Sequence, residues 1–368
     1  MLGSGAPRGS SSNLSSTLFS FAGNASNATA EIAAASGFPH IRLMTAGRVV
    51  NEPLVPQAEL PYVEQHWSVA SEESVGGPWG SNFSAACWFF GRAVHQSRRY
   101  PIGLVSANWG STNVETWSSP AGLQKCGVHD GLPKNTPPPS RPDCKHLGEP
   151  CTSTDGYHGA ECCGGRCFFY SKPPLWPGGG YCDEASPTNQ DSVLWNNILT
   201  PLFKMRIFGA VWYQGESDAG GKAAIDYACT FPQMVDDWRA AWARESGTDP
   251  VFPFGFVMLS ATGASTTGAV APDSALGWAV LRASQTSNHF SVPNPRQPRT
   301  FMSVAIDLGA YEGGCCSGKP DQAACNTYVT ILQYFLLILT RLLPRSPSHP
   351  ARPVMRHLFW ALTFTIAC

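Results

Sequence analysis

Two short stretches place polar side chains and glycine directly after an apolar run. Residues 214–218 read QGESD and follow AVWY, and residues 108–115 read NWGSTNVE and follow IGLVSA. A serine directly after a strand is where a nucleophile elbow would place its nucleophile, and glycine N–H groups at a helix entrance can stabilise an oxyanion. The two stretches are therefore the first candidates for a site.

Each stretch also has a purely structural interpretation. GESDA (215–219) comes close to the Gly-x-Ser-x-Gly turn of nucleophile elbows, but Ala219 replaces the second glycine. By motif alone, the favoured interpretation is a glycine turn whose residues 216–218 cap a helix or bind water. Thr112 and Glu115 have the spacing of a capping box. A glycine-rich helix entrance also supplies N–H groups for an oxyanion, and both interpretations of this second stretch can hold together.

The elements that must position these stretches alternate along the chain. Apolar runs of strand length lie at 41–46, 102–107, 207–213, 254–260 and 301–307. Segments with helical spacing of apolar residues lie at 83–96, 192–205, 231–245 and 275–287. Apolar strands separated by helices predict a parallel sheet covered on both faces, which is a three-layer α/β fold. Both polar stretches then lie at the carboxyl edge of the sheet, where loops and helix N-termini meet.

Composition excludes one class of function and indicates a compartment. The 368 residues carry a formal net charge of −1, so no basic surface for nucleic acid is predicted. The 13 cysteines favour disulfides formed in an oxidising compartment. Asn-x-Ser/Thr glycosylation sites begin at Asn13, Asn24, Asn27 and Asn82. We therefore predict a secreted or lumenal protein, extracellular or lysosomal, although the first residues contain no continuous apolar segment typical of a signal peptide.

Residues 126–182 interrupt the alternation because they are rich in proline, glycine and cysteine. We interpret them as a disulfide-rich insertion. Six cysteines in it, spaced C-x6-C-x10-C-C-x3-C-x14-C, are Cys144, Cys151, Cys162, Cys163, Cys167 and Cys182. This order resembles the inhibitor cystine knot, which implies pairing of Cys144 with Cys163, of Cys151 with Cys167 and of Cys162 with Cys182. A zinc cluster with His146 and His158 is the alternative, but the spacing lacks paired C-x2-C knuckles.

The chain changes character after CNTY (325–328). The apolar run at 329–339 is interrupted by Gln333 and followed by Arg341, so it is shorter than the about 20 residues that span a bilayer. We predict a short hydrophobic helix or a divergent tail here and no membrane span.

Three segments carry a resemblance to a known family. They are FSAACWFFGRAVHQSRRYPIGLVSANWGSTNVETWSSP (83–120), SVLWNNILTPLFKMRIFGAVWYQGESDA (192–219) and FMSVAIDLG (301–309). With the ordered motifs W-G-x-T-x-x-E-x-W and W-Y-Q-G-E-S-[ND], they resemble the sialate O-acetylesterase family of the SGNH hydrolases. We accordingly divide the chain into an esterase-like first part (1–125, irregular at 1–26), the cysteine-rich insertion (126–182), an esterase-like second part (183–328) and a divergent hydrophobic tail (329–368).

The resemblance implies a flavodoxin-like sheet and a serine esterase that needs neither metal ion nor organic cofactor. Such an enzyme removes acetyl groups from sugar hydroxyls, so the implied partner is an acetylated sugar or glycan. On this chain the resemblance assigns an oxyanion N–H to Gly110 and an oxyanion or substrate amide to Gln214. It assigns Glu216 to orienting the neighbouring loops or the sugar.

The chain departs from the family at the nucleophile and at the base. The family has its serine in G-Q-S-N-M, and the nearest match here is Ser12 within RGSSSNLSS. Ser111 stands where the family has the second glycine of its oxyanion turn. The family's histidine lies in an I-H-P motif that this sequence lacks, and His349 has only the following proline. A triad without its base loses around three to six orders of magnitude in rate.

The sequence therefore leaves two functions open. The first is a carbohydrate O-acetylesterase that hydrolyses acetyl esters by serine acyl transfer, poorly in the chain as written. The alternative is a catalytically impaired homologue that binds a glycan or a protein through the cysteine-rich insertion.

Overall fold

The computed structural model describes residues 28–47, 50, 55–76, 83–110, 112–128, 150–151, 165–168, 180–184, 190–259, 272–304 and 359–365. The strands of its main sheet are β1 (Ile41–Ala46), β2 (Val63–Val69), β3 (Ile102–Ser106), β7 (Gly209–Tyr213), β8 (Phe254–Met258), β9 (Thr300–Val304) and β10 (Phe359–Thr365). The α-helices are α2 (Ala28–Ala34), α3 (Glu72–Gly76), α4 (Ala85–Arg98), α5 (Pro120–Lys125), α6 (Thr200–Leu202), α7 (Gly221–Ser246) and α8 (Pro272–Gln285).

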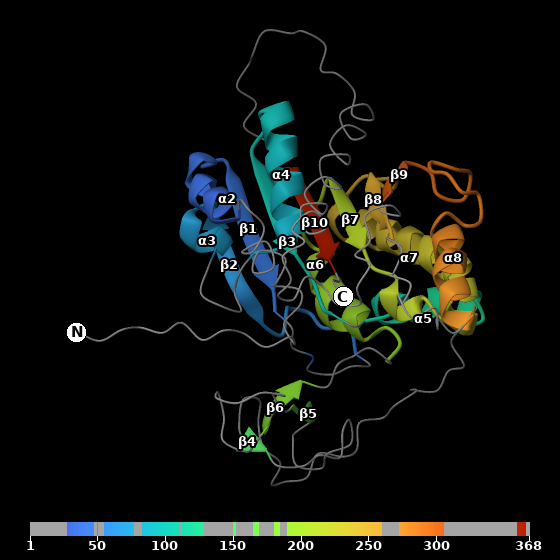
Figure 1. Cartoon of the computed structure of the whole chain (residues 1–368). Coiled ribbons are helices and arrows are strands. Elements are labelled where there is room, and N and C mark those ends of the chain that lie inside the picture. Colours follow the sequence, from blue (N-terminus) through green and yellow to red (C-terminus); the bar gives the residue numbers. More distant parts are fainter. Residues whose placement is uncertain are drawn as a thin grey trace.

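The main sheet has seven strands in the order β2-β1-β3-β10-β7-β8-β9 (Figure 1). Only β2 runs antiparallel to its neighbour, and the other neighbouring pairs are parallel. The five apolar runs predicted as strands all form strands, and each begins within two residues of its predicted start. The predicted parallel α/β sheet is therefore confirmed.

Helices cover both faces of the sheet, as the register shows. Leu104, Ala361 and Gly209 lie in register across β3, β10 and β7, so these three positions belong to the same face of the sheet. Helix α4 packs on that face, because a methyl group at its Gly91 would overlap Leu104. Trp212 points to the opposite face and contacts Trp238 of α7, with 5.6 Å between ring centroids. The fold consequently has the three layers that the sequence predicts.

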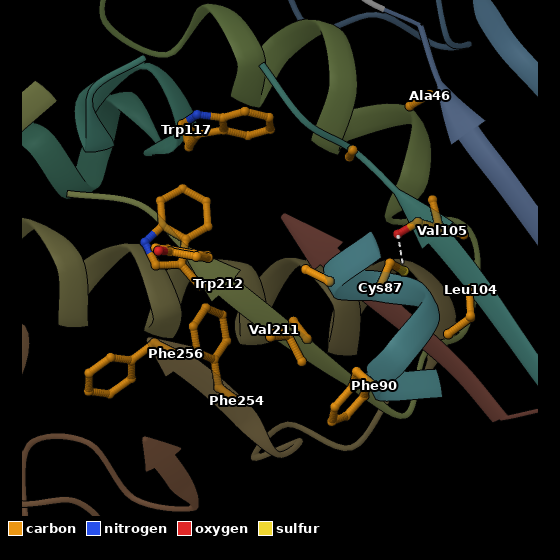
Figure 2. Packing of buried hydrophobic residues seen from close by; sticks show 14 of the residues in the cluster. Ala46, Cys87, Phe90, Leu104, Val105, Trp117, Val211, Trp212, Phe254 and Phe256 are labelled. Atoms are coloured by element: carbon orange, nitrogen blue, oxygen red, sulfur yellow. Dashed lines mark hydrogen bonds between the residues drawn. The ribbon is translucent and has the colours of Figure 1, made fainter. Parts of the chain in front are cut away.

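Large aromatic side chains fill the layer between α7 and the sheet. Trp212 lies beside Trp117, with ring centroids 5.9 Å apart, and Phe254 and Phe256 lie close by (Figure 2). Phe254 contacts Trp238 at 5.8 Å between centroids. These rings are fully buried and edge-to-face contacts predominate among them, so they hold α7 and β7 in a fixed relative position.

Strand β10 lies in the centre of the sheet although it comes from the last residues of the chain. Phe359 pairs with Ile102 of β3, and Thr365 pairs with Tyr213 of β7. The sequence predicts no strand here, since this segment belongs to residues 329–368, which we assigned to a divergent tail. The apolar run at 329–339 lies outside the described residues. Within the described part of the chain, no helix has the length and apolarity needed to cross a bilayer.

The helix predicted at 192–205 forms in a modified way. A π-helical turn, η5 (Trp195–Leu199), leads into the short helix α6. The hydroxyl of Thr200 donates to the carbonyl oxygen of Trp195 over 2.9 Å, and Pro201 follows. Because proline has no N–H group, the regular i to i−4 hydrogen bond is missing at this point and the turn widens.

The insertion contributes a second, small sheet, which lies apart from the main sheet in Figure 1. Its antiparallel strands are β4 (Pro150–Cys151), β6 (Gly180–Glu184) and β5 (Gly165–Phe168), in that order. Cys144, Cys162 and Cys163 lie outside the described residues, so the knot-like pairing stays a prediction.

A disulfide joins Cys126 and Cys229. Cys126 lies at the start of the insertion, directly after α5, and Cys229 lies in α7. The sequence does not predict this bond. It closes the chain on either side of the insertion and ties α5 to α7.

Candidate active site

The two polar stretches meet at the carboxyl edge of the sheet. The amide Nε2 of Gln214 donates to the carbonyl oxygen of Thr112 over 3.0 Å. The backbone N–H of Val114 donates to Oδ2 of Asp218 over 3.1 Å. Both loops therefore lie together at the predicted edge of the sheet, although the two strands from which they come are not neighbours, because β10 lies between them.

Gln214 lies at the centre of a buried hydrogen-bond network, and its side chain is 0% exposed. The indole Nε1 of Trp212 donates to the hydroxyl oxygen of Tyr227 over 3.2 Å. The hydroxyl proton of Tyr227 is therefore available to another acceptor. This hydroxyl donates to Oε1 of Gln214 over 2.9 Å. This bond fixes which end of the amide carries nitrogen. The two N–H groups then point to the carbonyl of Thr112 and the carboxyl of Asp218.

The amide of Gln214 thus has protein partners on all sides. Each of its two N–H groups donates a hydrogen bond, and its oxygen accepts one. A contact between an N–H group of this amide and an oxyanion would require one of these bonds to break. In the structure Gln214 joins the loop after β3 to the loop after β7.

The turn after β7 depends on Gly215. Its φ angle of 143° is one that favours glycine, and a methyl group there would lie 2.8 Å from Leu281. The next residues form the 3-10 helix η6 (Glu216–Asp218), in which Glu216 is half-buried and Ser217 is exposed. Helix α7 begins after Gly220 without a side-chain cap, so residues 216–218 do not cap this helix. Asp218 instead accepts from the N–H of Val114, the first residue of the 3-10 helix that follows the other loop.

The loop after β3 is fixed by Thr112. Its hydroxyl donates to the carbonyl of Trp109 over 2.9 Å and accepts from the indole N–H of Trp117 over 3.0 Å. The helix that follows, η2 (Val114–Trp117), has Asn113 as its N-cap residue and no side-chain cap. The capping box predicted for Thr112 and Glu115 is therefore wrong, because the hydroxyl is engaged within the loop.

Known proteins resemble this chain over most of its length. It is 34% identical over 284 residues to the sialate O-acetylesterase of Mus musculus, in an alignment that covers 77% of this chain and 47% of the mouse protein. It is 32% identical over the same length to the sialate O-acetylesterase of Homo sapiens, covering 77% of this chain and 44% of the human protein. Sialate O-acetylesterases are therefore homologues of this chain. The chain spans about half the length of the curated relatives that it matches.

A solved structure supports the fold. A carbohydrate acetylesterase from Xanthomonas citri superposes with a TM-score of 0.53 at 22% identity, covering 87% of this chain and 52% of that chain. No protein-family model matches the chain.

Among the residues that the sequence predicts for the site, the structure brings Gly110, Gln214 and Glu216 to one edge of the sheet. Gly110 is half-buried in the turn before Thr112. Ser12, Ser111 and His349 lie outside the described residues. Within the described ranges, no three His, Cys, Asp or Glu side chains gather in a way that could hold a metal ion.

The site also contains residues for which the sequence predicts no contact across the loops. Burial and the nearby Glu115 raise the pKa of Asp218 well above its ordinary value. Burial and the nearby Asp218 likewise raise the pKa of Tyr227. The only sequence signal for these roles is that Asp218 ends the QGESD motif and that Glu115 belongs to the first motif. Tyr227 has no such signal, since it lies in the second turn of a long helix.

Proposed function

We propose that this chain is a carbohydrate O-acetylesterase that hydrolyses acetyl esters on sugar hydroxyls by serine acyl transfer. One observation carries the proposal: a chain with 32–34% identity to sialate O-acetylesterases brings both polar motifs to one edge of its sheet through the hydrogen bonds of Gln214 and Asp218. This edge is where parallel α/β sheets bind their ligands.

In this mechanism the hydroxyl oxygen of Ser12 attacks the acetyl carbonyl carbon while a histidine accepts the hydroxyl proton. The histidine returns this proton to the sugar oxygen as the ester bond breaks. Water then attacks the acyl-enzyme and releases acetate. The N–H group of Gly110 stabilises the oxyanion of each tetrahedral intermediate.

The other two predicted residues have separate roles. Gln214 keeps the oxyanion loop in place, because its amide holds the carbonyl of Thr112 two residues beyond Gly110. Glu216, half-buried at the edge of the sheet, orients the neighbouring loops or the sugar.

The test follows acetate release from an acetylated sialic acid by the purified chain and by its Ser12→Ala and Ser15→Ala variants. We expect slow release, below the about 1–1000 per second of ordinary enzymes, which Ser12→Ala abolishes and Ser15→Ala leaves unchanged. Ser15 is the matched control because it lies in the same serine-rich segment. Equal release by the wild type and the Ser12→Ala variant would contradict the proposal.

A second candidate function is binding without hydrolysis. The sequence favours it, because it contains neither a G-Q-S-N nor an I-H-P segment. Isothermal titration of the same protein with the same acetylated sialic acid separates the candidates. Binding heat without any acetate release supports the binding protein, whereas release that depends on Ser12 supports the esterase.

A further inference from the structure

Two acidic side chains lie between the loops that follow β3 and β7, and the acyl transfer proposed above uses neither. Asp218 is 1% exposed and Glu115 is 5% exposed. Oδ1 of Asp218 accepts no hydrogen bond from an N–H or hydroxyl group of the described residues. Its carboxyl neighbour is Glu115, whose side chain lies within hydrogen-bonding reach of Asp218. A hydrogen bond between two carboxyl groups requires a proton on one of them.

The surroundings of the pair favour keeping this proton. Burial and the charge of Glu115 both act against an ionised Asp218, while hydrogen bonds from Gln214 and Val114 act in the opposite direction. The charges of Asp218, Glu216 and Glu115 all raise the pKa of Tyr227 in α7, so this neighbourhood is acidic. None of the groups with the largest effect on the pKa of Asp218 is a lysine, arginine or histidine. Two buried carboxylates without a cation cannot both ionise cheaply, so the pair shares one proton.

We propose that Asp218 is a positioning residue: paired with Glu115 through one shared proton, it fixes the loop after β3 against the loop after β7. Oδ2 of Asp218 accepts from the N–H of Val114 over 3.1 Å and also from the amide of Gln214. The shared proton occupies the other side of the carboxyl group. Asp218 thus contacts the first loop through both of its oxygens.

The catalytic consequence rests on the proposed function. The loop that Asp218 holds includes Gly110 and Thr112, and Gly110 is proposed to bind the oxyanion. The shared proton itself is independent of catalysis, because it follows from the burial and contacts of the pair. Its tests therefore need no substrate.

The first test is infrared spectroscopy of the purified chain in heavy water at neutral pH. We expect the wild type to show the carbonyl band of a protonated carboxylic acid. An exposed aspartate has lost its proton at this pH and would show no such band. Both Asp218→Asn and Glu115→Gln should lose this band, since an amide supplies the donor that the proton supplied. A wild-type spectrum without the band at neutral pH would overturn the proposal.

The second test separates positioning from simple packing. In Asp218→Asn the amide oxygen still accepts from Val114 and the amide nitrogen donates to Glu115, whereas Asp218→Ala has neither group. We expect the amide hydrogen of Val114 to exchange about tenfold faster or more in the alanine variant than in the wild type. The asparagine variant should stay close to the wild type. Equal loss of protection in both variants would overturn the proposal.

The third readout is the pH dependence of stability. The pKa of Asp218 is raised above its ordinary value of 3.8 in the folded protein. Its contribution to stability is therefore fully present below pH 3.8 and is lost as the pH rises through the raised pKa. Asp218→Asn should remove this decline, because asparagine takes up no proton on folding. An unchanged decline in the variant would overturn the proposal, whatever the acetate assay shows.

Discussion

Replacing Gln214 with alanine removes three hydrogen bonds at once from the centre of the site. The hydroxyl of Tyr227 loses its acceptor and the carbonyl of Thr112 loses the amide donor. Leaving a buried polar group without its partner costs about 1–3 kcal/mol, so two such groups lower the free energy of unfolding by about 2–6 kcal/mol. That is a large part of the about 5–15 kcal/mol by which a typical domain is stable.

Urea unfolding followed by tryptophan fluorescence measures this loss, since several tryptophans surround the site. Gln57→Ala is the matched control, because the side chain of Gln57 makes one exposed hydrogen bond, to the carbonyl of Val55 over 2.8 Å. We expect the control to change the free energy of unfolding by no more than about 0.5 kcal/mol. A Gln214→Ala variant within about 1 kcal/mol of the wild type would refute the network described here.

A double-mutant cycle tests the orientation of the amide. Tyr227→Phe removes the hydroxyl that donates to Oε1 of Gln214, which costs about 1–3 kcal/mol by itself. Because both substitutions remove the same hydrogen bond, the double variant should lose less than the sum of the single losses, by about 1 kcal/mol. Additive losses would show that the two side chains do not interact.

Two further predictions concern the scaffold. Because Cys126 and Cys229 are 103 residues apart, replacing both with serine should lower the free energy of unfolding by about 2–5 kcal/mol. Urea curves with and without reductant check this, and a wild-type midpoint that reductant does not shift would contradict it. Gly91→Ala should cost about 1–3 kcal/mol in the same assay, because its methyl group would overlap Leu104. Gly37→Ala, which meets open space, is its control and should change little.

The sequence predicts the strands that are buried on both faces, because each is a continuous apolar run. It does not predict an exposed edge strand, or a strand whose position depends on partners far away along the chain. β3 is buried at every position, and its residues form a continuous apolar run. β2 lies at an edge and is half-exposed, so its sequence VEQHWSV shows no such run. β10 has an apolar sequence, but its place between β3 and β7 depends on partners far away along the chain. Local patterns contain no information about such partners.

The candidate site shows the same division between local pattern and distant contact. The motif after β7 correctly predicts an edge of the sheet, because polar residues directly after a buried strand must leave the core. It does not predict which side chain faces the ligand, since that depends on the partners that Thr112 and Tyr227 provide. Gln214 and Asp218 are buried and hold the loops together. Glu216, which is half-buried, and Ser217, which is exposed, are the side chains of the motif that remain accessible at this edge.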